Sequence, residues 1–222
     1  KGEKLVRLED CSPDVVALFP RIMEVADRLC IKSSPLFDTA EAERKFGNCS
    51  VEVLSLAGEC KQVNIYVDGG APTLSAAAVG MGCFEVDRSK ADSYSFADAP
   101  VELSEYQYLT IPDVALVHSR LVAAAFAGKA DVWSNNGVAL SREYPENVLG
   151  RIFKIDEIFD FGSKELKRAL KGKKIEIFRR DFPNSNSEIC RKFSVKEGAA
   201  ERWCFTRICG KLLAIKLVPH QR

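Results

Sequence analysis

Basic residues are concentrated in the last third of the chain, where their spacing could support binding of a polyanion. Residues 151–222 contain 18 Lys and Arg against 9 Asp and Glu, whereas residues 1–150 contain 14 against 22. Lys164, Lys167, Arg168 and Lys171 are three and four residues apart, which places them on one face of a helix. Such a face can bind phosphates through point charges, and each neutralised phosphate releases a counterion. The candidate binding residues are Lys164, Lys167, Arg168, Lys171, Lys173, Lys174, Arg179, Arg180, Arg191 and Lys192.

Aromatic residues alternate with this charge along the sequence. They are Phe178, Phe182, Phe193, Trp203 and Phe205. If they are exposed, they could stack on the bases of a single strand. If they face inward, they form a core beneath a solvated basic surface. The predicted partner is a nucleic acid, with single-stranded RNA favoured, and an acidic membrane surface is the other candidate polyanion.

The sequence offers little evidence for catalysis. It contains no P-loop, GxSxG, HExxH or complete dinucleotide-binding glycine motif. His118 has no acidic partner at a diagnostic spacing, and the eight cysteines form no CxxC pair. We therefore predict no catalytic residue, no metal site and no cofactor, and we expect reduced cysteines that are mostly buried. Disulfides in a secreted chain are the alternative for the cysteines.

Periodicity along the chain predicts the elements that hold these residues. We expect an N-terminal helical segment over residues 1–47 and a β-rich core over residues 48–222 that includes the basic third, and the two could form one continuous domain. Segments 50–56, 62–67 and 82–87 are predicted as antiparallel strands of one sheet, with a turn at 68–72. Residues 163–171 are predicted as a basic helix, and 191–195, 202–208 and 212–218 as strands. The fold expected from this pattern is mainly β with peripheral helices, an antiparallel β-sandwich or a jelly-roll-like barrel.

Residues 63–104 contain an ordered set of features that resembles a known family. An apolar strand ends at Asp68, Gly80 follows twelve residues later, and Phe84 to Asp87 form a further strand. This order resembles the core of the 30K superfamily of plant-virus cell-to-cell movement proteins, with Asp68 and Gly80 as its anchors. The resemblance implies a jelly-roll-like domain that binds single-stranded nucleic acid without sequence preference. It also implies an intracellular location in the host cytoplasm and at plasmodesmata.

Three functional readings follow from these observations. The first is a non-enzymatic viral protein that binds single-stranded nucleic acid through its basic C-terminal face and supports cell-to-cell movement. The second is a self-assembling viral matrix or capsid-type protein, a homo-oligomer that meets membrane or genome through the same surface. The third is an enzyme whose site the sequence does not reveal.

Overall fold

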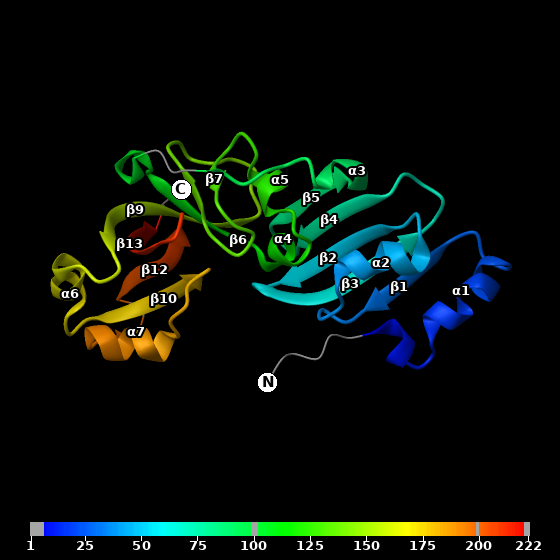
Figure 1. The fold of residues 1–222 in the computed structure, drawn as a ribbon, viewed down its shortest axis with the longest axis horizontal. Coiled ribbons are helices and arrows are strands. Elements are labelled where there is room, and N and C mark those ends of the chain that lie inside the picture. Colours follow the sequence, from blue (N-terminus) through cyan, green and yellow to red (C-terminus); the bar gives the residue numbers. More distant parts are fainter. Residues whose placement is uncertain (1–6, 99–101, 199, 220–222) are drawn as a thin grey trace. The chain divides into compact units, whose positions relative to one another are not determined.

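The computed structural model describes residues 7–98, 102–198 and 200–219, and Figure 1 shows the order of the elements. Contacts between Cα atoms divide the chain into two compact units. Unit 1 comprises residues 1–95 and 113–125, and unit 2 comprises residues 96–112 and 126–222. The division predicted from the sequence, between residues 1–47 and 48–222, stays a prediction.

Unit 1 is built on a five-stranded sheet in the order β1-β3-β2-β4-β5. Its strands are β1 Leu29–Ser33, β2 Ser50–Leu56, β3 Glu59–Val67, β4 Thr73–Ala78 and β5 Gly82–Asp87. Neighbouring strands are antiparallel, except that β2 and β4 run parallel. Its helices are η1 Leu8–Asp10, α1 Val15–Met23, α2 Thr39–Phe46, α3 Arg88–Ala91 and α4 Val114–His118, and α5 Val122–Phe126 ends one residue into unit 2.

One face of this sheet carries the core of unit 1. Val53 and Val63 on β2 and β3 are 0% exposed, as is Leu116 on α4, which contacts both strands. The buried Asp113 caps α4 and accepts a hydrogen bond from Ser55 Oγ at 2.5 Å. The capping carboxylate therefore fixes the start of α4 against the sheet.

Three strands predicted from the sequence are present in this sheet. Segments 50–56, 62–67 and 82–87 lie in β2, β3 and β5, and residues 68–72 form a loop as predicted. The predicted antiparallel arrangement is only partly right, because β4 separates β5 from β2 and runs parallel to β2. Strand β4 is not predicted from the sequence, because its run of alanines lacks the β-branched and aromatic residues typical of strands. Strand β1, which lies inside the segment expected to be helical, is also not predicted.

Unit 2 contains an eight-stranded sheet in the order β11-β10-β12-β13-β9-β6-β8-β7. Its strands are β6 Tyr108–Pro112, β7 Asp131–Val132, β8 Ala139–Ser141, β9 Gly150–Asp160, β10 Lys174–Arg180, β11 Lys196–Glu197, β12 Glu201–Ile208 and β13 Lys211–Pro219. Strand β10 runs parallel to β11 and β12, and the other pairs are antiparallel. Its helices are η2 Leu103–Glu105, α6 Lys164–Leu170 and α7 Asn186–Phe193.

The two faces of the unit 2 sheet are covered by separate apolar clusters. The helix-side cluster joins α6 and α7 to the sheet, and its buried members are Phe161, Leu166, Leu170, Ile175, Phe182, Ile189, Phe193, Val195, Trp203, Phe205 and Ala214. The buried members of the opposite cluster are Tyr106, Leu109, Ile111, Val138, Leu140, Phe153, Cys204, Ile208, Leu213, Ile215 and Leu217. Trp203 and Phe205 belong to one cluster and Cys204 to the other, as expected when alternate residues of a strand face opposite sides.

The fold agrees with the sequence prediction only at a coarse level. Strands dominate and helices lie beside them, but both sheets are mixed, and in the described residues neither closes into a barrel. The predicted antiparallel sandwich or jelly roll is not seen, because α7 connects β10 to a parallel neighbour, β12. The strand predicted at 191–195 is wrong, because residues 186–193 form α7. No helix in the described residues is long and apolar enough to cross a membrane.

Candidate nucleic-acid interface

Helix α6 presents four of the predicted basic residues to solvent. Ser163 begins the helix by accepting a hydrogen bond from the Leu166 amide at 3.1 Å. Leu166 and Leu170 are 0% exposed and pack in the helix-side cluster. Their burial turns the opposite face of α6 outward. The exposed residues on it are Lys164, Lys167, Arg168 and, directly after the helix, Lys171.

Helix α7 adds two basic residues to the same side of the sheet. A reciprocal capping box between Ser185 and Glu188 fixes its start. Arg191 and Lys192 are exposed. The Lys192 Nζ lies 4.0 Å from the centroid of the Phe161 ring, so this side chain is held by a cation–π contact. Because α6 and α7 (Figure 1) both pack on the helix-side cluster, the six predicted residues that lie on these helices or directly after α6 are on one side of the unit 2 sheet.

Of the remaining four predicted residues, Arg179 is exposed on the same side of the sheet as the helices and donates to the Asn184 carbonyl beside the start of α7, whereas the other three do not extend this surface. Lys173 lies 2.6 Å from Glu201, so its charge is already paired. Lys174 and Arg180 share one face of β10, whereas Arg179 lies on the other, because alternate residues of a strand face opposite sides. Arg180 Nη1 donates to the Arg179 carbonyl at 3.2 Å. Alternation along a strand separates Lys174 and Arg180 from Arg179, but the sequence shows neither which face of β10 the helices cover nor that Lys173 pairs with Glu201.

Most basic residues of α6 and α7 are not in ion pairs in the part of the chain that the structure describes. Within the described residues, no carboxylate lies at ion-pair distance from Lys164, Lys167, Arg168, Lys171 or Arg191. Elsewhere in unit 2 some basic side chains contact acids, as in the 2.7 Å pair between Lys216 and Asp156, whereas others, such as Lys154 and Lys211, form no ion pair with the described residues. The outer face of α6 therefore carries positive charge that the folded chain does not neutralise.

Four of the five aromatic residues considered for base stacking belong to the core. Phe182, Phe193, Trp203 and Phe205 are at most 8% exposed. They make ring contacts within the helix-side cluster, such as Phe161 against Phe182 at 4.8 Å. Only Phe178 is half-buried. Base stacking on the four buried rings is therefore excluded in this conformation.

The two family-motif residues, Asp68 and Gly80, shape separate turns. Asp68 Oδ1 accepts a hydrogen bond from the Gly70 amide at 3.0 Å in the loop after β3. Gly80 has φ +81° in the turn between β4 and β5, a conformation that glycine adopts without strain. Strand β4 lies between the two turns, and its six residues span about 20 Å. The structure therefore does not bring the two residues together in one site.

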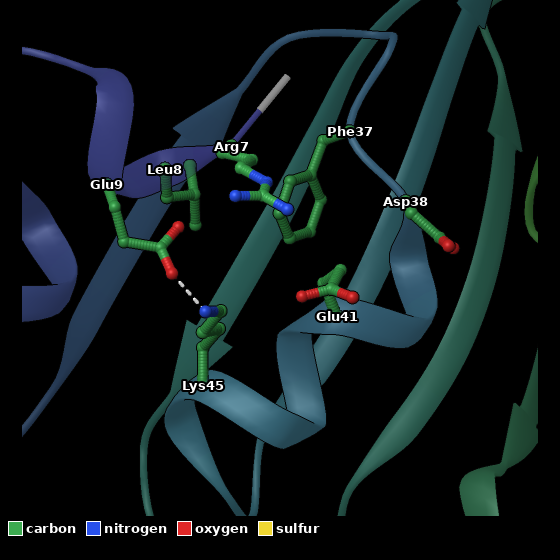
Figure 2. Close-up of a pocket in the computed structure, with 7 residues that line it drawn as sticks. All are labelled: Arg7, Leu8, Glu9, Phe37, Asp38, Glu41 and Lys45. Carbon is green, nitrogen blue, oxygen red and sulfur yellow. Dashed lines mark hydrogen bonds and ion pairs between the residues drawn. The ribbon is translucent and has the colours of Figure 1, made fainter. Parts of the chain in front are cut away.

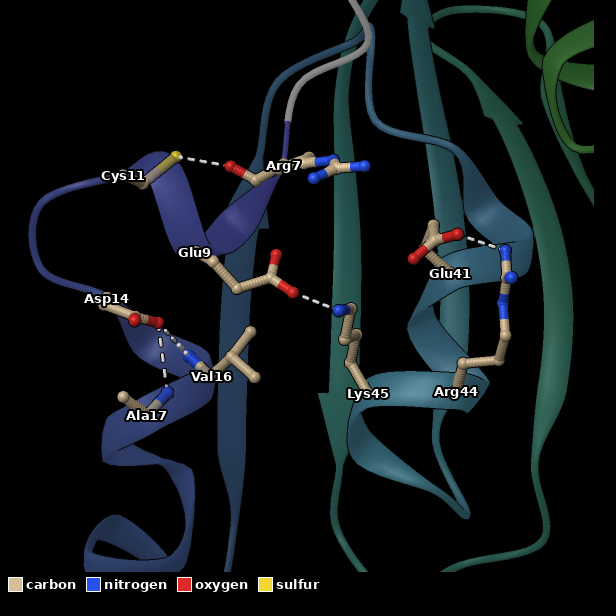
Figure 3. Close-up of polar contacts among 9 residues, drawn as sticks. All are labelled: Arg7, Glu9, Cys11, Asp14, Val16, Ala17, Glu41, Arg44 and Lys45. Atoms are coloured by element: carbon tan, nitrogen blue, oxygen red, sulfur yellow. Dashed lines mark hydrogen bonds and ion pairs between the residues drawn. The ribbon is translucent and has the colours of Figure 1, made fainter.

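One cavity in unit 1 is lined by several charged groups. It has a volume of about 270 Å³ and is lined by Arg7, Leu8, Glu9, Phe37, Asp38, Glu41 and Lys45 (Figure 2). Lys45 pairs with Glu9, and Arg44 pairs with Glu41 (Figure 3). The pKa of Glu9 is lowered, first by its hydrogen bond from Lys45. The Lys45–Glu9 pair joins η1 to α2, so these charged groups hold the two helices together.

No cluster of catalytic or metal-ligating groups is seen in the part of the chain that the structure describes. His118 Nε2 lies 3.0 Å from the Phe37 carbonyl oxygen. No group of three His, Cys, Asp or Glu residues there could hold a metal ion. All eight cysteines are free, as predicted, but only Cys49 and Cys204 are buried, so the expectation of mostly buried thiols is wrong.

Comparison with known proteins relates unit 2 to a domain family other than the viral movement proteins. A family model described as "THUMP domain-like" matches residues 150–216, from β9 to β13. A solved structure described as "Crystal structure of putative methyltransferase from Porphyromonas gingivalis W83" matches with a TM-score of 0.82 at 19% sequence identity. The match covers 96% of this chain and 56% of that one, so the chain spans little more than half the length of that protein. At this identity the similarity is one of fold. No curated protein matches the chain.

These comparisons correct the family prediction. The predicted relationship to 30K movement proteins is wrong, because the chain has the fold of a bacterial protein and its basic third matches a THUMP-like domain. The predicted viral function, whether in cell-to-cell movement or as a matrix or capsid-type protein, is wrong for the same reason. An apolar strand followed by Asp and Gly is a pattern that unrelated β-hairpins and turns also produce, since both residues favour turns.

Proposed function

We propose that this chain binds RNA through the outer faces of α6 and α7, as part of a protein that modifies RNA. The observation that carries the proposal is the row of unpaired basic residues on α6, inside the segment that matches a THUMP-like domain. THUMP domains bind RNA. The fold-level similarity to a protein described as a methyltransferase supports a role in RNA modification. We also propose that the protein is intracellular.

The charge of the matched segment suits a phosphate backbone. Residues 150–216 contain 17 Lys and Arg against 9 Asp and Glu. From Lys164 to Lys171 the helix rises about 10 Å, so these side chains can reach neighbouring phosphates. Their contacts would be electrostatic and independent of sequence. We therefore expect binding that weakens steeply as salt concentration rises.

The direct test is a variant that removes the charge of α6 and keeps its buried face. It carries four changes to glutamine, at Lys164, Lys167, Arg168 and Lys171. Each lost contact with single-stranded RNA should reduce the slope of log K against log salt by about 0.7, so the slope should fall by about 3 in total. The fold should be retained, because exposed charges contribute little to stability.

A matched control separates a local surface from general electrostatic attraction. It carries four changes to glutamine at exposed basic residues of unit 1, namely Arg21, Arg44, Lys61 and Lys90. We expect this control to retain nearly the full salt slope. Equal slopes for the α6 variant and the unmodified protein would contradict the assignment of the surface. Absence of RNA binding by the unmodified protein at low salt would contradict the proposed function.

A further inference from the structure

Arg151, at the start of β9, lies over two aromatic rings on the sheet face opposite α6 and α7. Its Cζ is 4.9 Å from the centroid of the Phe178 ring and 5.3 Å from that of Phe153. The two rings are 5.2 Å apart and pack in the opposite cluster. The Arg151 side chain is nevertheless 58% exposed. The rings therefore support the guanidinium while much of it stays open to solvent.

The charged groups beside Arg151 are only partly paired with one another. Glu176 forms its short contact, 2.9 Å, with Arg202 Nε, and it lies 3.9 Å from Arg151. Glu176 and Arg202 are both about one-third exposed. Two guanidinium groups thus share one carboxylate, and donors and an acceptor stand side by side at the surface.

The backbone holds Arg151 in this place through a close approach of β9 to β6. A Cβ atom on the preceding residue, Gly150, would lie 2.5 Å from the Ile111 carbonyl oxygen and 2.8 Å from Thr110 Cγ2. Only glycine fits there without displacement of one strand. Because Arg151 is paired in register with Ile111, its position follows from this packing.

Two further cations lie on the same face of β10 as Glu176 and Phe178. They are Lys174, which is exposed, and Arg180, which is half-buried and whose buried Nε has no hydrogen-bond partner among the residues that the structure describes. Alternate residues of a strand are about 6.6 Å apart on one face. A stacking platform flanked by cations is the usual arrangement for binding single-stranded nucleic acid.

We propose that Arg151 is the stacking platform for one unpaired base of the bound RNA. The base lies on the open face of the guanidinium, its edge faces Glu176 and Arg202, and Lys174 contacts a neighbouring phosphate. Arginine planes stack on splayed-out bases in RNA recognition. This inference rests on the proposed RNA binding and adds base contacts to it, at a site separate from the outer face of α6.

The test compares Arg151→Lys with the unmodified protein on two ligands of equal length. One is a single-stranded RNA, and the other is an abasic strand with the same sugar-phosphate backbone. Lysine keeps the charge and loses the plane, so affinity for RNA should fall at least about fivefold, the lower end of the effect of one stacked base. Affinity for the abasic strand and the salt slope should not change.

A matched control variant is Arg142→Lys, which changes another half-exposed arginine of unit 2 that lies over an aromatic ring, 5.6 Å from the Tyr106 centroid. It should bind both ligands as the unmodified protein does. An equal loss of affinity for both ligands in Arg151→Lys, or no loss for either, would overturn the base site. RNA binding by the unmodified protein in those cases would leave the proposed function intact, and its absence would overturn the proposed function itself.

Discussion

Replacement of Leu166 by alanine tests how the basic surface is held in place. Leu166 is 0% exposed and, with Leu170, docks α6 on the helix-side cluster. Truncation of a buried leucine costs the transfer free energy of the lost atoms and leaves a cavity, for a total of about 2–5 kcal/mol. That is a large fraction of the roughly 5–15 kcal/mol that stabilises a typical domain.

The change can be measured by urea unfolding followed by tryptophan fluorescence. Both tryptophans of the chain, Trp133 and Trp203, lie in unit 2, so the signal reports on this unit. The control is Lys167→Ala, the next residue along, whose exposed side chain should contribute less than about 0.5 kcal/mol. A loss below about 1 kcal/mol for Leu166→Ala, or equal losses for the two variants, would refute the docking of α6 through this residue.

Three other predictions concern unit 2. Ser185→Ala should destabilise the unit by about 1 kcal/mol, because it removes the cap of α7 that pairs with Glu188, and urea midpoints will show this. Burial raises the pKa of Cys204 to about 12, so its thiol should react with a disulfide reagent only after unfolding, which mass spectrometry of the labelled protein will reveal. Burial acts to raise the pKa of Glu201, but hydrogen bonds, led by that from Lys173, lower it below the usual range of a glutamate. The stability that this pair contributes should be present above about pH 4.5 and lost as pH falls through the folded pKa, and Lys173→Met should flatten that acid limb of the stability curve.

The sequence predicts elements whose signals are local. The basic helix at 163–171 is observed as α6, because Ser163 caps it, leucines recur at helical spacing and Gly172 follows it. The strands at 50–56 and 62–67 are observed because apolar residues alternate along them. A capping box at Ser185 also indicates α7, but Phe193 and Val195 alternate with polar residues in the pattern typical of a strand, so the sequence predicts a strand at 191–195.

Features that depend on distant residues could not be predicted. The parallel pairing of β10 with β12 depends on α7 as the connection, and the order of strands in a sheet has no local signal. The sequence predicts Lys173 as a binding residue, although in the structure it pairs with Glu201, 28 positions away. The platform of Arg151 and Phe178 joins residues 27 positions apart on two strands that are not neighbours in the sheet.

The most direct test of the account is protection of individual lysines from chemical acetylation when RNA binds. With saturating single-stranded RNA at low salt, modification of Lys164, Lys167 and Lys171 on α6 should fall, because phosphates would cover their ammonium groups. Lys61 and Lys90 of unit 1 are exposed and serve as internal references whose modification should not change. Equal modification of the α6 lysines with and without bound RNA would contradict the central claim, as would protection confined to unit 1.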